Sequence, residues 1–367
     1  MKIPFVDLFA QYKSIQPEID AAIADVIASS AFIRGPHVEA FEKNYAQVMG
    51  IPHCVSCANG TDAIYITLKA LGIGPGDEVI TTSHSWIATS ETITQAGARV
   101  VFVDTERSTF NIDPALIEAK ITPRTRAIIV VHLYGQPASM DEIRAIASRH
   151  NLWIIEDCAQ AHFARYKDAY VGSMGIAGTF SFYPGKNLGA MGDAGCIVTA
   201  NAELARKMAV YARHGGLKKG IHEIEGINSR LDGLQAAILN VKLKHILKWT
   251  SAKQEIAALY SRELKGVGDL VLPEIAPDRT HVFHLYVIRT RQREQLRQHL
   301  SQAGVDTVIN YPIALPFLPA YRYLGHKPED FPVSYENQST ILSLPIYPEM
   351  SAEQARYVIE QVKAFFS

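Results

Sequence analysis

The sequence has no long hydrophobic run and no excess of charge of either sign. Its longest apolar stretch, residues 127–131, is far shorter than the run of about 20 residues that crosses a membrane. Residues 1–7 lack the apolar core of a signal peptide. The 36 basic and 37 acidic residues give a net charge of −1, and no basic block is present. We therefore expect a cytoplasmic protein that binds neither nucleic acid nor a membrane.

Cysteine is also scarce, with four residues in the whole chain. Cys54 and Cys57 form a CxxC pair, a spacing found in redox-active and zinc-binding sites, but no second pair accompanies it. Both lie in a short strand-like stretch, while Cys158 and Cys196 stand alone in apolar surroundings. We therefore expect reduced, buried thiols and no metal site.

The first 199 residues alternate between helix-like and strand-like patterns. At 367 residues, with 48% apolar and 20% charged residues, the chain is long enough for a large core and about two domains. Helical periodicity covers residues 17–29, 38–49, 59–71, 85–96, 113–120 and 139–150. Apolar, β-branched strands are predicted at 53–58, 78–81, 99–103, 126–133, 152–156 and 196–199. This alternation predicts an α/β fold whose mostly parallel sheet is covered on both faces.

The pattern changes after residue 199. Helices are predicted over residues 202–214 and 231–264, joined by a polar loop from 215 to 230. A smaller α+β unit follows, with a strand at 282–289 and helices at 292–303 and 352–365. We expect a large domain of residues 1–250 and a small domain of residues 251–367, with the boundary inside a long helix.

One lysine is presented by a glycine-rich bend. The apolar run that ends at Phe182 is followed by Tyr183, the turn Pro184-Gly185, and then Lys186. Further glycines lead into the next strand. A lysine held by backbone geometry in this way suits a Schiff-base residue, although a solvated surface lysine has the same local pattern.

Three other stretches could serve the same chemistry. Asn59-Gly60-Thr61 lies between a strand and a helix, where free backbone N–H groups bind an anion or a side chain simply caps the helix. Trp86 follows a strand and could stack on a planar ligand or fill the core. Asp157 ends a strand, where it could pair with a ring nitrogen or cap the next helix, and Gln160 follows one helical turn later.

Taken together, these stretches resemble the sugar aminotransferases of the DegT/DnrJ/EryC1/StrS family, pyridoxal phosphate enzymes of fold type I. The resemblance covers nearly the whole chain. Its motifs are Asn59-Gly60-Thr61-Asp62-Ala63, Glu156-Asp157-Cys158-Ala159-Gln160-Ala161-His162, Ser181-Phe182-Tyr183-Pro184-Gly185-Lys186-Asn187-Leu188-Gly189 and Asn228-Ser229-Arg230-Leu231-Asp232. Two positions depart from the family pattern, because Cys158 replaces a small alanine and Phe163 replaces a glycine. Neither removes a catalytic group, but Phe163 is expected to change the packing nearby.

The resemblance implies a role for each of these residues. Lys186 and Asp157 are the expected catalytic residues, with Lys186 covalently bound to the cofactor and Asp157 paired with its pyridine nitrogen. Gln160 would contact the phenolic oxygen of the ring, and Trp86 would stack on the ring. The remaining residues would hold the phosphate, with the last contributed by the other subunit of a homodimer: Gly60, Thr61, Ser181 and Asn228.

The resemblance further implies that an amino group passes, usually from glutamate, to a nucleotide-linked keto-sugar. Tyr183, His222 and Tyr311 are the candidate substrate residues, although a solvated loop is the more ordinary setting for His222 and the loop of Tyr311 is similarly ambiguous. Arginines that could clamp a second carboxylate are expected to be solvated, which favours a sugar acceptor: Arg289, Arg291, Arg293 and Arg297. Alternatives on the same scaffold are a sugar dehydratase, a regulatory protein, an amino-acid aminotransferase and a cysteine desulfurase. The sequence leaves the sugar, the nucleotide and the aminated carbon (C3 or C4) open.

Overall fold

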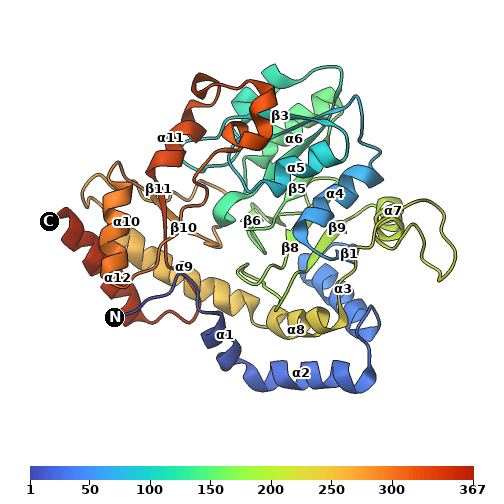
Figure 1. The fold of residues 1–367 in the computed structure, drawn as a ribbon, viewed down its shortest axis with the longest axis horizontal. Helices are drawn as coiled ribbons and strands as arrows, with labels where there is room; N and C mark the ends of the chain where they lie inside the picture. The colour runs from blue at the N-terminus through green and yellow to red at the C-terminus, as the bar shows by residue number, and fades with distance from the viewer.

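A computed structural model describes residues 1–367 and is built around one seven-stranded sheet (Figure 1). The strand order is β1-β9-β8-β5-β4-β2-β3. Strand β9 is antiparallel to both of its neighbours, and all other pairs are parallel. The strands are β1 (His53–Cys57), β2 (Glu78–Thr82), β3 (Arg99–Val103), β4 (Thr125–Val131), β5 (Trp153–Asp157), β8 (Ala177–Ser181) and β9 (Gly195–Thr199). The prediction of a mostly parallel sheet is confirmed.

Helices cover both faces of this sheet. Neighbouring strand residues pack to opposite sides, so that Ile128 and Ile129 belong to different apolar clusters. This burial on both faces explains why the strands read as continuous apolar runs. One face is covered by α4 (Gly60–Ala70), α5 (Ala88–Gln95) and α7 (Ala202–Ala212). The other is covered by α2 (Gln16–Ser29), α3 (Pro36–Met49), α6 (Met140–His150) and α8 (Gly233–Leu243).

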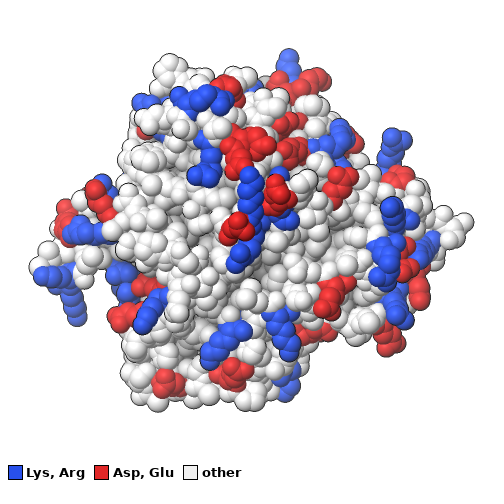
Figure 2. Space-filling view, turned by 180° about the vertical axis from the view of Figure 1, so that it is seen from behind, with Lys and Arg blue, Asp and Glu red and all other residues white.

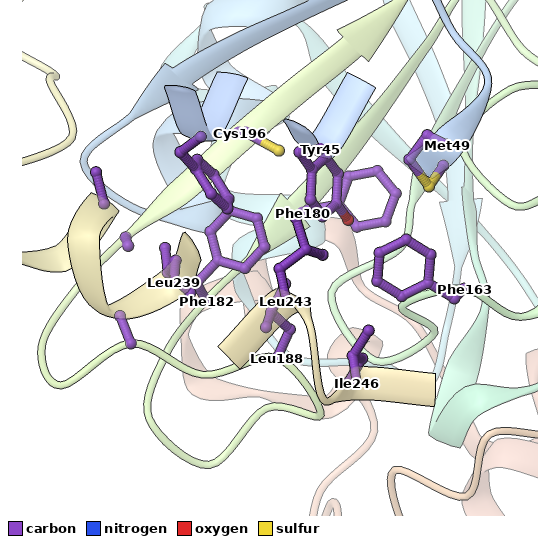
Figure 3. Packing of buried hydrophobic residues seen from close by; sticks show 14 of the residues in the cluster. Tyr45, Met49, Phe163, Phe180, Phe182, Leu188, Cys196, Leu239, Leu243 and Ile246 are labelled. Atoms are coloured by element: carbon purple, nitrogen blue, oxygen red, sulfur yellow. The ribbon is translucent and has the colours of Figure 1, made fainter. Parts of the chain in front are cut away.

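An aromatic cluster supports the strand that leads to Lys186. Tyr45 of α3 lies with its ring centroid 5.4 Å from that of Phe180 and 5.5 Å from that of Phe182 (Figure 3). Phe163 packs on the same tyrosine at 5.6 Å although its φ angle is +61°, a conformation that favours glycine. The burial of this ring in the aromatic cluster offsets the strain of its backbone, while the expected difference from the family's packing stays a prediction.

A second, smaller unit has its own core and receives the N-terminus of the chain. It contains α9 (Ile246–Glu263), β10 (Tyr286–Arg289), α10 (Arg293–Gln302), β11 (Ile341–Leu344) and α12 (Ala352–Phe366). Strands β10 and β11 pair antiparallel, and Ile3 is buried in the cluster that these elements form. Residues 315–331, however, pack back onto the large sheet, where the Tyr321 hydroxyl lies 2.8 Å from Ser90 Oγ. The division at residues 250 and 251 stays a prediction.

Several predicted elements differ in detail. The helix predicted over residues 231–264 is two helices, because i→i+3 bonds at Lys244 and His245 tighten the turn and redirect the chain. Residues 113–120 form two 3₁₀ turns, Pro114–Leu116 and Glu118–Lys120, instead of one helix. The helix expected from residue 85 begins only at Ala88, since Ser83 still bonds to strand β3. Elements that the sequence did not indicate are α1 (Leu8–Ser14), β6 (Arg165–Tyr166), β7 (Ala169–Tyr170), α11 (Pro332–Thr340) and the strand β11.

The surface carries both signs of charge. Figure 2 shows acidic and basic side chains interspersed on the face it presents, without a broad area of one sign. None of the helices combines the length and apolarity that a membrane crossing requires. The loop that joins α7 and α8 extends away from the body of the molecule (Figure 1).

Candidate active site

Lys186 lies in a closed bend directly after β8. Its backbone N–H donates to the Tyr183 carbonyl at 2.8 Å, and the bend closes through Ala190 N–H to the Phe182 carbonyl at 2.7 Å. A side chain at Gly189 would place a Cβ only 2.2 Å from the Pro184 carbonyl oxygen, so the bend requires glycine there. Burial lowers the pKa of the Lys186 amine to about 8, although the Asp157 carboxylate opposes this shift. Far more of this amine is therefore neutral and nucleophilic near physiological pH than in an ordinary lysine.

Asp157 ends β5 beside Lys186 and is 6% exposed. Its Oδ2 accepts a hydrogen bond from Thr89 Oγ1 at 2.8 Å, and its Oδ1 accepts one from Ala159 N–H at 3.2 Å. These donors fix the orientation of the carboxylate. The sequence prediction did not include Thr89, although its position three residues after Trp86 at the same strand-to-helix corner was a usable signal.

The Gln160 amide is oriented from both ends. Its Oε1 accepts from Tyr134 N–H at 2.8 Å, and its Nε2 donates to the Tyr311 hydroxyl at 2.8 Å. The ring of Tyr311 lies 5.7 Å from that of Trp86 at an interplanar angle of 43°. Trp86 itself is 58% exposed, so it presents an aromatic surface rather than filling the core. The fold thus brings these predicted residues together from segments far apart in the sequence.

The start of α4 meets the end of β8 at very short range. Asn59 caps the helix by accepting from Asp62 N–H at 2.8 Å. A Cβ on Gly60 would lie 2.5 Å from the Cβ of Ser181, so only glycine allows this approach. The free N–H groups at Gly60 and Thr61 and the Ser181 hydroxyl form a cradle that suits a phosphate. Ser229 holds the loop before α8 against this cradle by donating to Asp62 Oδ2 at 2.7 Å and accepting from Ala58 N–H at 3.0 Å.

Two predicted residues lie away from Lys186 within the same chain. Asn228 is exposed just before Ser229, and His222 is exposed on the protruding loop, where its Nδ1 lies 2.6 Å from the His214 carbonyl. Neither lines the cavity that Lys186 faces. Their expected contacts, with the partner's phosphate site for Asn228 and with substrate for His222, stay predictions.

A buried His–Glu pair positions the strand that carries Asp157. Glu156 accepts hydrogen bonds from three backbone N–H groups, those of Gly172, Met174 and Gly175, at 2.6 to 2.7 Å. It also lies 2.9 Å from His132 Nε2, while His132 Nδ1 accepts from Ala138 N–H. Since these atoms are already engaged, we interpret the group as a structural support for β5.

A cavity of about 420 Å³ opens in front of Lys186. Gln160, Tyr183 and Tyr311 line it, together with residues of the N-terminal segment and of the second unit. None of the four arginines that could clamp a second carboxylate contributes to the lining. Their expected solvation holds for Arg291 and Arg297 but is wrong for Arg289 and Arg293, which are half-buried. Arg289 stacks 5.1 Å above the Phe110 ring, away from the cavity.

Comparison with known proteins identifies the family. Residues 13–363 match the DegT/DnrJ/EryC1/StrS aminotransferase family. The chain belongs to this family. The chain is 47% identical to a "Pleiotropic regulatory protein" of Geobacillus stearothermophilus, covering 100% of this chain and 99% of the relative. It is 43% identical to a dTDP-3-amino-3,4,6-trideoxy-alpha-D-glucose transaminase of Streptomyces venezuelae, covering 99% of this chain and 96% of the relative. It is 42% identical to a UDP-2-acetamido-2-deoxy-3-oxo-D-glucuronate aminotransferase of Pseudomonas aeruginosa, covering 97% of this chain and 98% of the relative.

Solved structures of the family agree with this assignment. S. venezuelae DesV in complex with a ketimine intermediate superimposes with a TM-score of 0.98 at 42% identity, covering 100% of this chain and 99% of that chain. NtdA from Bacillus subtilis with bound cofactor PMP has a TM-score of 0.92 at 34% identity, covering 100% and 85%. The chain therefore has fold type I and is a pyridoxal phosphate-dependent sugar-nucleotide aminotransferase.

The residues of this chain fit pyridoxal phosphate. The Gly60 cradle leaves no room for a Cβ and presents hydrogen-bond donors to an anion, while Asp157 offers a fixed carboxylate beside the Lys186 amine. When bound, the cofactor supplies an electron-accepting ring. Asp157 would hold a proton on the ring nitrogen, and the Lys186 amine would move a proton at the substrate carbon. These two roles and the binding roles of the other residues stay predictions.

The lowered pKa of Lys186 has a measurable consequence. The neutral amine reacts with the cofactor aldehyde, so the loading rate of cofactor-free protein should rise with pH up to about 8 and then level off. The buried His162 and His284 have pKa values far below this range and do not contribute. The loading rate is measured by stopped flow at each pH and divided by the rate at which free N-acetyl-lysine amide reacts with the same cofactor. This ratio removes the effect of the cofactor's own titration. This ratio should be flat below pH 8 and fall above it, whereas a ratio that stays flat to pH 10 would show an ordinary lysine.

Proposed function

We propose that this protein transfers the amino group of glutamate to a 3-keto hexose carried on a nucleotide, as a step in amino-sugar biosynthesis. The observation that carries the proposal is the Lys186 amine, which is held beside Asp157 and faces a cavity of about 420 Å³. A cavity of this size accepts a hexose or an amino acid, and its lining contains aromatic residues but no arginine and no carboxylate. Two relatives are named as transaminases that act at position 3 of a hexose, which favours C3 over C4.

The aromatic residues of the cavity suit a sugar ring. Tyr183 is 59% exposed at the cavity rim, and Tyr311 is fixed by Gln160 on the inner wall. Each offers a flat apolar face and a hydroxyl, the combination that binds a sugar ring. We therefore assign both residues to substrate binding under this proposal.

The test is a panel of nucleotide-linked keto-sugars. The protein loaded with cofactor is supplied with glutamate and with dTDP- or UDP-linked hexoses that differ only in a 3-keto or a 4-keto group. We expect amination at C3, identified by mass spectrometry and NMR of the product. Exclusive amination at C4 would overturn the assignment of the carbon, and no product from any sugar would overturn the proposed function.

A regulatory role is the second candidate, because one relative at 47% identity is named a regulatory protein. The same purified sample separates the two. A purely regulatory protein needs no reactive lysine, whereas an enzyme binds the cofactor covalently and shows its visible absorbance band. The intact Lys186, Asp157 and Gln160 and their mutual geometry favour the enzyme. The intact lysine also argues against a dehydratase, since dehydratases of this scaffold replace it.

We further propose a homodimer with shared active sites. The loop between α7 and α8 exposes the apolar side chains Leu217, Ile221 and Ile224, which are 46%, 58% and 53% accessible. Large apolar side chains on an extended loop favour burial against another surface. Asn228 ends the same loop and is exposed, so it is available to a second copy of the chain.

A further inference from the structure

A second lysine, which is buried, shares the cavity with Lys186. Lys253 lies on α9, is 6% exposed and lines the cavity. Its Nζ donates to Asn187 Oδ1 at 3.0 Å and to the His284 carbonyl at 3.2 Å. An ammonium group has three N–H donors, so one remains for a ligand. Because Asn187 directly follows Lys186, the two amino groups belong to the same chamber.

The charge pattern of the lining makes Lys253 distinctive. Among the 21 residues that line the cavity, Lys186 and Lys253 carry the only cationic side chains, and none carries a carboxylate. The remaining basic group, His284, is neutral, because burial and the charge of Lys186 keep its pKa well below its usual value. Lys186 is used in the covalent bond to the cofactor. Burial lowers the pKa of Lys253 to about 7, so its amine is partly protonated near neutral pH, and an anionic group that enters the cavity would favour the charged form.

Two hydroxyl groups in the same wall also lack partners. Thr250 Oγ1 and the Tyr347 hydroxyl are buried without a hydrogen bond, and both residues line the cavity beside Lys253. Glu349 is the one nearby carboxylate whose charge acts on Lys253, but both of its oxygens lack a hydrogen-bond partner. The ammonium group of Lys253 is thus not neutralised by a hydrogen-bonded protein carboxylate.

We propose that Lys253 binds a substrate carboxylate in this cavity, and that this carboxylate is the side-chain carboxylate of the amino donor. The inference rests on the proposed function, in which a dicarboxylic amino acid is the donor. It explains how a site without a clamping arginine selects such a donor. A lysine forms one charge-assisted hydrogen bond there, where the fork of an arginine would form two. A uronic-acid sugar is the other source of a carboxylate.

Paired ligands test the proposal on the cofactor-loaded protein. 2-Oxoglutarate and 2-oxopentanoate differ by the second carboxylate, and calorimetric titration gives the affinity for each. We expect Lys253→Met to lose roughly 10- to 100-fold of the preference for 2-oxoglutarate, and Lys253→Arg to retain most of it. The matched control is Lys242→Met. Lys242 is also buried, at 3% exposure, but bonds to Gln11 and the Gly189 carbonyl and does not line the cavity.

The outcomes separate the possible explanations. An unchanged preference in Lys253→Met, or an equal loss in Lys242→Met, would overturn the proposal. Lys253→Gln serves as a second variant if the methionine variant melts early or fails to load cofactor.

A parallel titration compares keto-sugar nucleotides with and without a C6 carboxylate. If the preference is lost there but kept for 2-oxoglutarate, the carboxylate belongs to the acceptor and the donor assignment is overturned. Failure of every keto-sugar to be aminated would refute the proposed function, while the 2-oxoglutarate titration would still decide the role of Lys253.

Discussion

Replacing Lys186 with alanine is expected to lower turnover by more than about 10⁴-fold, because the change removes both the covalent attachment and the group that moves the proton. The protein should remain folded, since this side chain is half-buried and its ammonium makes no hydrogen bond within the chain. Weak cofactor binding should persist through the Gly60 cradle and Asp157. Steady-state rates measure the loss of turnover, and thermal melting checks that the variant remains folded. The matched control is Lys265→Ala at an exposed lysine, which should leave turnover unchanged.

Borohydride reduction checks the same residue directly. The reagent fixes the cofactor on the lysine that holds it, and peptide mapping then identifies that lysine. The label should be found on the peptide that contains Lys186 and be absent from the alanine variant. A label on a different lysine would sink the assignment, whatever the rates of the variant.

Mixing two inactive variants is expected to restore activity if the active sites are shared. In a heterodimer of Lys186→Ala and Asn228→Ala chains, one site lacks both residues and the other has both. Random exchange of equal amounts should therefore give roughly a quarter of the wild-type rate per chain. Each parent alone should stay inactive in the same assay.

Subunit exchange must be shown independently, for example with chains that carry different mass tags. Exchange without recovered activity would argue against a contribution of Asn228 to the partner's site. A different result, in which Asn228→Ala alone is active, would show that this residue does not hold the phosphate at all. Mixing two Lys186→Ala preparations controls for activation by handling.

The sequence was most informative where the fold depends on short-range geometry. Asp157 ends a strand of the predicted parallel sheet and Trp86 follows the end of another, and both positions were interpreted as places for ligand-binding residues. The structure places Asp157 at the end of β5 and Trp86 after β2 of the same sheet, in which Ser181 ends the neighbouring strand β8. A motif glycine is also informative where two segments approach so closely that no side chain fits. Gly60 is such a residue, because a Cβ there would collide with Ser181.

Residues that act through distant packing carried no such signal. Lys253 lies in the middle of an amphipathic helix, where its spacing gives no indication that it reaches Asn187 and the cavity. Residues 315–331 pack on the large sheet through the side chains of Tyr321 and Phe331. This contact joins segments far apart in the sequence, so no local pattern predicts it. The helix break at Lys244 could not be predicted either. The residues around it favour helix, and tertiary contacts redirect the chain there.

The central claim is that a keto-sugar, not a 2-keto acid, accepts the amino group. A single-turnover experiment tests it most directly, by mixing protein that carries the amine form of the cofactor with each acceptor class and following the visible absorbance of the cofactor on Lys186. The account predicts rapid return of that absorbance with a nucleotide-linked 3-keto hexose and at most slow return with aromatic or branched 2-keto acids. Rapid return with those acids, and none with any keto-sugar nucleotide, would contradict it.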